Sequence, residues 1–329
     1  MISEIEIHKS LSHPNVVKFE RSFENEKNIF ILLEMCSNQT LNDLLKKRKV
    51  VTELEVRYYL IQLISGLKYI HEHNIIHRDL KLRNLFLNDK MQLKIGDFGL
   101  AAKINFEGEK RKTICGTPNY IAPEVLNSKV GHSYEADIWS IGILIYALLV
   151  GNPPFKAGNS KETYDKIRRG AYSFPEDTSL SREVKDLIQK LLTQDPYKRL
   201  TLDQILEHEF VSGYNIPQFM PDSTLIYPPS ESFCKKYSET PSSSSNEGTT
   251  LEETKSIIPS IKETEEETQI ETLKAESIAA LPKSQIDTVW IKKWLDYSSK
   301  YGLGYITTNN CTGVYFADNA KIILHPNKR

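Results

Sequence analysis

The chain has 329 residues, 40% of them apolar, which is enough to bury one large core or two modest ones. A formal net charge of −1 gives no overall positive field, so we expect no nucleic acid and no membrane surface among its partners. The four cysteines are far apart with no Cys-x-x-Cys pair, which argues against a disulfide framework or a zinc site. The longest apolar run, residues 138–150, is shorter than the ~20 residues that cross a bilayer.

Composition divides the chain into three zones. Residues 1–213 carry dense, periodic apolar patterning and are predicted to form a folded domain. Residues 214–288 are rich in Ser, Thr, Glu and Pro, with few large apolar side chains to offset the entropy of ordering, and are predicted to be a disordered linker. Aromatic and β-branched residues return in residues 289–329.

The predicted elements of the first zone begin with a helix over residues 1–10 and a hairpin of strands at 16–19 and 29–33. The basic run 46–49 is predicted to be a solvated loop. Thr52 and Glu55 form a capping box that opens a long helix ending near residue 74. The later predicted elements are strands at 85–87 and 93–95, and helices at 137–150, at 181–193 and after Thr201. A small sheet followed by a helical block predicts an α+β fold.

Two motifs carry the chemistry. His77-Arg78-Asp79-Leu80-Lys81-Leu82-Arg83-Asn84 lies between the long helix and the 85–87 strand, and Asp97-Phe98-Gly99 begins 13 positions after Asn84. In this order and context they resemble the catalytic-loop and metal-binding signatures of protein kinases. Each tripeptide alone recurs by chance, but their joint spacing makes a chance match improbable.

The resemblance assigns roles that suit phosphoryl transfer, which needs positioning and charge neutralisation more than covalent chemistry. Asp79 is predicted to orient the acceptor hydroxyl and take its proton, and Lys81 to face the migrating phosphoryl group. Asn84 and Asp97 offer the hard oxygen ligands that Mg²⁺ requires beside the phosphates of ATP. A lysine two residues after the aspartate resembles the serine/threonine branch of these enzymes.

A polar activation segment follows, closed by Ala122-Pro123-Glu124. Thr113 is its predicted phosphorylation site, because a phosphate there could pair with Arg78 and order the segment. The alternative is that Thr113 is an ordinary solvated threonine.

Four further residues of this region are predicted to support the site. Thr117 is expected beside the catalytic loop, where it would favour a serine or threonine acceptor. Glu124 is expected to pair with Arg199, and Asp137 to brace the catalytic loop, both as scaffold.

Several segments are similar to the polo-like kinase family. They are the end of the activation segment (Gly116–Glu124), the run Lys94–Ala101, the tripeptide Ser212-Gly213-Tyr214, and the segment 290–305, which resembles the opening of a polo box. The resemblance implies a bilobal kinase fold, ATP and Mg²⁺ as cofactors, and protein substrates with serine or threonine acceptors. It also implies an upstream activating kinase, docking to phosphorylated proteins through a complete polo box, and a role in mitosis and the cell cycle. The expected locations are cytoplasm and nucleus, with centrosomes or spindle poles and kinetochores.

The same resemblance assigns a nucleotide pocket. Glu4 matches the glutamate that pairs with the phosphate-binding lysine of the family, and Leu33 matches the gatekeeper. Glu34 and Cys36 lie in the predicted hinge, and Phe86 is the predicted floor under adenine.

Both ends depart from the family pattern. No Gly-rich loop and no lysine-bearing strand precede Glu4, so the small lobe is expected to be truncated. Trp294 matches a tryptophan that contacts phosphopeptides, but the polo box is expected to be incomplete. We therefore expect an internal fragment or an incomplete gene model, which the genomic sequence upstream of Met1 would test. The competing interpretation is a truncated, catalytically impaired scaffold or interaction protein.

Overall fold

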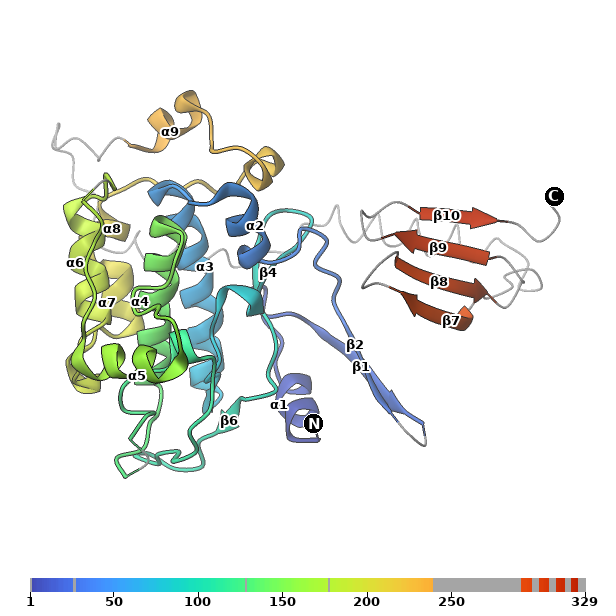
Figure 1. Cartoon of the computed structure of the whole chain (residues 1–329), viewed down its shortest axis with the longest axis horizontal. Coiled ribbons are helices and arrows are strands. Elements are labelled where there is room, and N and C mark those ends of the chain that lie inside the picture. The colour runs from blue at the N-terminus through green and yellow to red at the C-terminus, as the bar shows by residue number, and fades with distance from the viewer. Residues whose placement is uncertain are drawn as a thin grey trace, which may run out of the picture. The chain divides into compact units, whose positions relative to one another are not determined.

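The computed structural model describes residues 2–238, apart from 26–27, 128 and 177, and the backbone of four strands between residues 291 and 324. It divides into two compact units, residues 1–244 and 245–329, which are considered separately (Figure 1). Among the described helices, none is long and apolar enough to span a membrane.

The first unit has the expected α+β composition, with its helices packed around one apolar core. Its helices are α1 (Ile2–Lys9), α2 (Leu41–Arg48), α3 (Glu53–Glu72), α4 (Glu135–Val150), α5 (Ser160–Arg169), α6 (Arg182–Leu191), α7 (Leu202–Glu207), α8 (Glu209–Ser212) and α9 (Glu231–Ser238). Short 3-10 turns are η1 (Leu82–Asn84), η2 (Pro118–Tyr120), η3 (Pro196–Lys198) and η4 (Asp222–Leu225).

The strands of this unit form antiparallel pairs. The pairs are β1 (Phe19–Glu24) with β2 (Ile29–Leu33), β3 (Ile75–Ile76) with β6 (Ala102–Lys103), and β4 (Leu85–Leu87) with β5 (Leu93–Ile95). The predicted strand at 16–19 is wrong in position, because β1 begins at Phe19 and Val16 makes only an isolated parallel bridge to Ile95.

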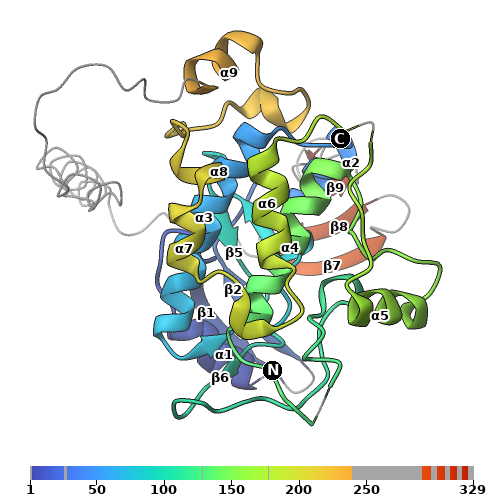
Figure 2. The same ribbon diagram turned by 90° about the vertical axis from the view of Figure 1, so that its left-hand side faces the viewer.

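Helices α3 and α4 form the centre of the helical lobe, and both figures show α6 and α7 beside them (Figure 2). The predicted capping box opens α3, with the Thr52 side chain accepting from the Glu55 N–H and Glu55 reaching back to the Thr52 N–H. Helix α4 is buried on all sides, as its continuous apolar sequence requires. Gly142 of α4 faces α6 so closely that a Cβ there would lie 2.8 Å from Leu192 Cδ2, which fixes the approach of the two helices.

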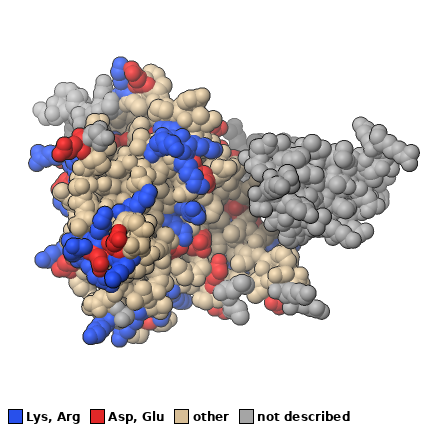
Figure 3. All heavy atoms as spheres, viewed as in Figure 1, with Lys and Arg blue, Asp and Glu red and all other residues tan. Residues whose placement is uncertain are grey.

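The basic run 46–49 is not the predicted solvated loop, because most of it belongs to α2. Thr40 caps this helix by accepting from the Asp43 N–H. The side chain of Arg48 is only 3% exposed and forms an ion pair with Glu55, which is fully buried. Figure 3 shows Lys and Arg side chains gathered over α2, and Lys46 is among the exposed ones.

The predicted disordered linker begins too early, because residues 214–238 include η4 and α9 and pack on the helical lobe. Thr224 is fully buried and Met220 is 3% exposed. Arg48 donates a 2.5 Å hydrogen bond to the carbonyl of Thr224, 176 positions along the chain. Residues 239–290 of the predicted linker lie outside the described residues.

The second unit is a four-stranded antiparallel sheet in the order β10-β9-β8-β7. Each strand pairs with the next along the chain, so the sheet is a meander. Its strands are β7 (Ile291–Tyr297), β8 (Gly302–Thr307), β9 (Thr312–Phe316) and β10 (Lys321–Leu324).

Candidate active site

Asp79 lies at the centre of a hydrogen-bonded group that joins the catalytic loop to the activation segment. Its Oδ1 accepts from the Thr117 backbone N–H at 3.0 Å and from Thr117 Oγ1 at 2.7 Å. Its Oδ2 accepts from Lys81 Nζ at 2.5 Å, and the same ammonium donates to Thr117 Oγ1 at 3.1 Å. Three predicted site residues thus meet at one carboxylate that is 6% exposed.

Of the two predicted metal ligands, Asn84 contacts Asp79 directly, and Asp97 follows Gly96, whose N–H donates to the Asn84 carbonyl at 2.9 Å. Asn84 is buried, and its Nδ2 donates to the Asp79 carbonyl at 3.0 Å, which commits the amide nitrogen and leaves the amide oxygen for a cation. Asp97 is exposed, and its Oδ1 accepts from the Gly99 N–H at 3.3 Å. No group of three or more His, Cys, Asp or Glu with metal-ligand geometry occurs in the described residues. Two protein oxygens fit Mg²⁺, which keeps waters and substrate phosphates in its shell.

Asp97 has a φ of 63°, a left-handed conformation that L-residues adopt only where the surrounding structure imposes it. Glu4 of α1 approaches the same turn. A Cβ built on Gly99 would lie 3.3 Å from Asp97 Oδ1 and 3.7 Å from Glu4 Oε2. The structure therefore brings the predicted α1 glutamate and the predicted metal ligand to the same glycine.

Phe98 anchors this turn in the core. It is 1% exposed and lies between two histidines, with ring centroids 4.7 Å from His8 of α1 and 5.3 Å from His77 of the catalytic loop. His8 also hydrogen-bonds through Nε2 to the Val17 carbonyl at 2.6 Å, and burial lowers its pKa. The stack connects α1, the metal-binding turn and the catalytic loop. His8 was not predicted from the sequence, although it lies one helical turn after Glu4.

Asp137, at the start of α4, holds the backbone of the catalytic loop as predicted. It is fully buried and accepts from the His77 N–H at 3.0 Å and the Arg78 N–H at 2.9 Å. His71 Nε2 lies 2.9 Å from its Oδ2. Burial by itself would raise the pKa of Asp137, but the hydrogen bond and charge of His71, with those of His77, hold the pKa below its ordinary value.

The predicted pair of Glu124 and Arg199 is present and bidentate. Both N–O distances are 2.7 Å, and the side chains are 5% and 1% exposed. Arg199 also donates to the carbonyls of Thr193 and Glu135, so its guanidinium is well satisfied. This pair ties the end of the activation segment to the turn before α7.

Most residues of the predicted nucleotide pocket lie at the end of β2, in the predicted hinge after it and in β4. Leu33 is 39% exposed. The Glu34 carboxylate forms an ion pair with Lys94 Nζ at 2.6 Å, a partner that was not predicted from the sequence. Burial, with the charge of Glu34, raises the pKa of Cys36 to about 11. Phe86 of β4 packs so close to Gly96 that a Cβ on Gly96 would lie 2.8 Å from its ring.

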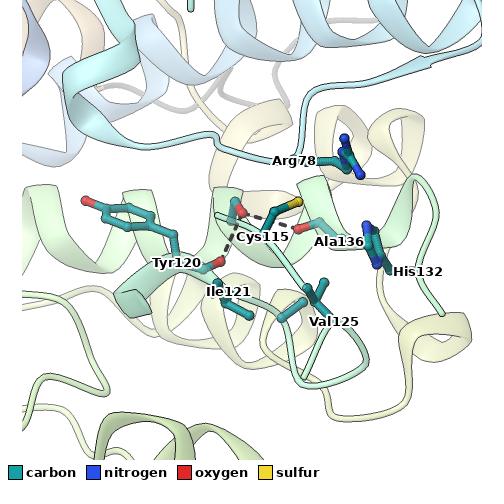
Figure 4. A pocket seen from close by; sticks show the side chains of 9 residues that line it. Arg78, Cys115, Tyr120, Ile121, Val125, His132 and Ala136 are labelled. Atoms are coloured by element: carbon teal, nitrogen blue, oxygen red, sulfur yellow. Dashed lines mark hydrogen bonds between the residues drawn. The ribbon is translucent and has the colours of Figure 1, made fainter. Parts of the chain in front are cut away.

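The predicted phosphorylation site, Thr113, is exposed on the activation segment. Arg78 has a φ of 64°, and its Nε donates to the Leu100 carbonyl at 2.6 Å. Arg78 also lines a small hollow beneath the segment together with Cys115 and His132 (Figure 4). The activating role of Thr113 stays a prediction. Trp294 belongs to β7, but its side chain lies outside the described residues.

Sequence comparison agrees with this arrangement. The model of the protein kinase domain matches residues 1–211, and that of the duplicated polo-box region matches residues 299–329. Relatives named as polo kinases are 42% identical over 99% of this chain. The chain belongs to the polo-like kinase family.

The relatives of this polo-like kinase chain include a probable serine/threonine-protein kinase CCRP1 from Zea mays, 42% identical over 99% of this chain and 68% of the relative. The serine/threonine-protein kinase polo of Drosophila melanogaster and the serine/threonine-protein kinase PLK1 of Xenopus laevis are also 42% identical over 99% of this chain. The matched regions make up 62% of the first relative and 59% of the second. The chain therefore spans about three fifths of the length of these two kinases. The polo-box match of this chain begins at residue 299, ten residues after the predicted start of that region at residue 289.

Proposed function

We propose that this chain carries the catalytic centre of a serine/threonine protein kinase that transfers the γ-phosphate of ATP to protein hydroxyl groups. The observation that carries the proposal is the position of the Asp79 carboxylate in the catalytic loop. This carboxylate is buried and accepts hydrogen bonds from Lys81 and Thr117. A carboxylate fixed in this way can orient an incoming hydroxyl and accept its proton.

The neighbouring residues divide the remaining work. The Lys81 ammonium, within reach of both Asp79 and Thr117, would place positive charge beside the transferred group. Asp97 and Asn84 would hold Mg²⁺, which when bound neutralises phosphate charge and fixes the phosphates of ATP. Thr117, anchored to Asp79 by its own hydroxyl, would leave room at this point for an acceptor the size of serine or threonine.

We propose that the complete protein docks phosphorylated proteins through its polo-box region, is activated by an upstream kinase at Thr113, and acts in mitosis and the cell cycle. The corresponding locations are the cytoplasm and nucleus, including centrosomes or spindle poles and kinetochores. Support for the docking role comes from the polo-box match at residues 299–329.

The test is transfer of labelled phosphate from ATP to a casein-like acceptor by the chain and by its Asp79→Asn variant. Asn keeps the size of the side chain and removes the carboxylate that would take the proton. We expect transfer by the unmodified chain and a loss of at least about 100-fold in the variant. Equal transfer by the two proteins would rule out catalysis at this site.

A second candidate is a non-catalytic interaction protein. The β1–β2 hairpin favours it, because this hairpin exposes large apolar side chains that a partner protein could cover. Phe23 is 53% exposed and stacks on Phe30 at 5.0 Å, and Met35 in the hinge is 82% exposed. Absence of transfer by a correctly folded chain that still binds partner proteins would favour this candidate.

A further inference from the structure

The β1–β2 hairpin is followed by a short backbone crossing into the helical lobe, residues 34–38, which the sequence predicts to be the hinge of the nucleotide pocket. This crossing is called the hinge segment below. In Figure 1 the hairpin projects away from the helices. The contacts at the base of the hairpin therefore decide where the hinge segment lies.

The side chain of Glu34 ties the start of the hinge segment to two other parts of the chain. Its Oε1 lies 2.6 Å from Lys94 Nζ of β5, and its Oε2 accepts from the Lys18 N–H at 3.0 Å. The Glu34 N–H in turn donates to the Lys18 carbonyl at 2.9 Å. The side chains of Lys94 and Glu34 are 12% and 25% exposed, so solvent screens this ion pair less than one on the open surface.

The far end of the hinge segment is held by β4 and the turn after it, without charged groups. The Asn38 N–H donates to the Leu87 carbonyl at 3.1 Å, and the Leu87 N–H donates to the Gln39 carbonyl at 2.9 Å. The Asn38 side chain also donates to the Asn88 carbonyl at 2.8 Å. The segment is thus fixed at both ends, and the tie at its start depends on one lysine.

The backbone between the two ties is open. Among the described residues, no backbone group pairs with the Glu34 carbonyl or with the Cys36 N–H. The side chain of Met35, between them, is 82% exposed and packs against little that could hold it. The position of these backbone groups is therefore set by the ties on either side.

Strand β5 connects the tie at Glu34 with the metal-binding turn. Lys94 lies opposite Phe86, the predicted floor of the pocket, in the β4–β5 ladder. Asp97 follows Lys94 by three residues, and three residues span at most about 11 Å. The ion pair of Lys94 with Glu34 therefore fixes the hinge segment relative to the predicted Mg²⁺ ligand.

We propose that Lys94 is a positioning residue for nucleotide binding, which holds the hinge segment where its backbone can meet the edge of an adenine base. In this role Lys94 acts through Glu34 and does not touch the nucleotide. The proposal rests on the proposed function in one respect, that the chain binds ATP in this pocket. What is added is a determinant of ATP affinity outside the catalytic loop and the metal-binding turn.

Loss of the ion pair would release one end of the hinge segment and leave the other end bound to β4. The apparent dissociation constant of a ligand rises by the factor by which the binding-competent fraction falls. If the released segment is in place about a tenth of the time, ATP binds about tenfold more weakly. Bound ATP would still face an unchanged Asp79, so KM for ATP should rise while kcat stays within about twofold.

The test is calorimetric titration of the whole chain with Mg·ATP, together with phosphate transfer to a casein-like acceptor. Lys94→Met keeps an unbranched side chain and removes the charge, and we expect ATP to bind about tenfold more weakly. Lys90→Met, which removes an exposed lysine from the β4–β5 turn, is the matched control and should bind ATP as the unmodified chain does. Equal affinities of the unmodified chain and Lys94→Met would overturn the proposal, and so would a fall in kcat with an unchanged KM.

A double replacement tests whether Lys94 acts through Glu34. Glu34→Gln breaks the same ion pair from the other side and should weaken ATP binding by a similar factor. The double variant should bind ATP no more weakly than either single variant, because both replacements remove one interaction. Additive losses would contradict the proposed route.

Hydrogen exchange gives a readout that does not depend on ATP. The Lys18 and Glu34 amides, at the tied end, should exchange at least about tenfold faster in Lys94→Met, while the Asn38 amide keeps its rate. Equal acceleration at both ends would indicate a general loss of stability and would overturn the positioning role. If the unmodified chain bound no Mg·ATP, the proposed function would fail together with the role of Lys94, whereas equal binding by the unmodified chain and Lys94→Met would refute the role of Lys94 alone.

Discussion

Replacing Asp137 by Asn tests how the helical lobe holds the catalytic loop. The carboxylate accepts from two backbone N–H groups, of His77 and Arg78, and from His71 Nε2. An amide keeps one accepting oxygen and places its own N–H₂ against a backbone N–H that it cannot satisfy. Losing one hydrogen bond to a charged acceptor costs about 1.5–3 kcal/mol, and the orphaned donor adds about 1–3 kcal/mol, so we expect a loss of about 3–5 kcal/mol in the free energy of unfolding.

The assay is urea unfolding followed by the fluorescence of Trp139, which is fully buried two residues after Asp137. Replacing Trp290 and Trp294 by Phe in all variants leaves Trp139 as the only reporter. Glu135→Gln, which removes a carboxylate from the first turn of the same helix, serves as control and is expected to cost less than about 1 kcal/mol.

The pH dependence of the same measurement has a definite sign. The pKa of Asp137 is lowered in the folded state, so its contribution to the free energy of unfolding is present above the unfolded pKa of about 3.9. This contribution is lost as the pH falls through the lowered pKa. The difference in the free energy of unfolding between the unmodified chain and Asp137→Asn should therefore be constant above about pH 5 and shrink below about pH 4. A difference smaller than about 1 kcal/mol at pH 7 would refute the reasoning.

Three further predictions concern other parts of the site. Arg199→Leu leaves Glu124 charged and buried, so urea unfolding should show a loss of about 3–5 kcal/mol in the free energy of unfolding. Replacing Glu124 by Leu as well should restore much of this loss, and additive losses for the two replacements would contradict the reasoning. Gly96→Ala places a methyl group 2.8 Å from the Phe86 ring, and should destabilise the chain by about 1–3 kcal/mol and weaken ATP binding by calorimetry; unchanged values would show that the ring moves freely. Cys36, with a pKa of about 11, should react with iodoacetamide at a rate that rises roughly tenfold per pH unit from pH 8 to 10, and a plateau below pH 9 would contradict the raised pKa.

Local sequence signals predicted the elements that local energetics determine. The strands at 85–87 and 93–95, the capping box at Thr52 and the helix after Thr201 lie where the patterns place them. Helix α2 was missed because its basic residues look like a solvated run, whereas Arg48 is buried by an ion pair with a residue of the next helix. A charge pattern alone contains no information on that partner.

Long-range packing explains the remaining differences. Residues 214–238 have the composition of a linker, yet Thr224 is buried and bonded to Arg48, 176 positions away. In the site, the motifs located Asp79, Asn84 and Asp97 because their spacing is fixed by the chemistry. The pairing of Arg111 with His132 was not predicted, because these two segments meet only through an isolated antiparallel backbone bridge.

We propose that Asp79, Asn84 and Asp97 belong to a single centre that holds a metal–nucleotide pair beside an acceptor hydroxyl. Calorimetric titration of the folded chain, phosphorylated at Thr113, with ATP in the presence and absence of Mg²⁺ measures this directly. We expect binding that depends on Mg²⁺ and is at least about tenfold weaker in the Asp97→Asn variant, a difference of about 1.4 kcal/mol. Absence of Mg²⁺-dependent binding, or equal binding by the variant, would contradict the claim.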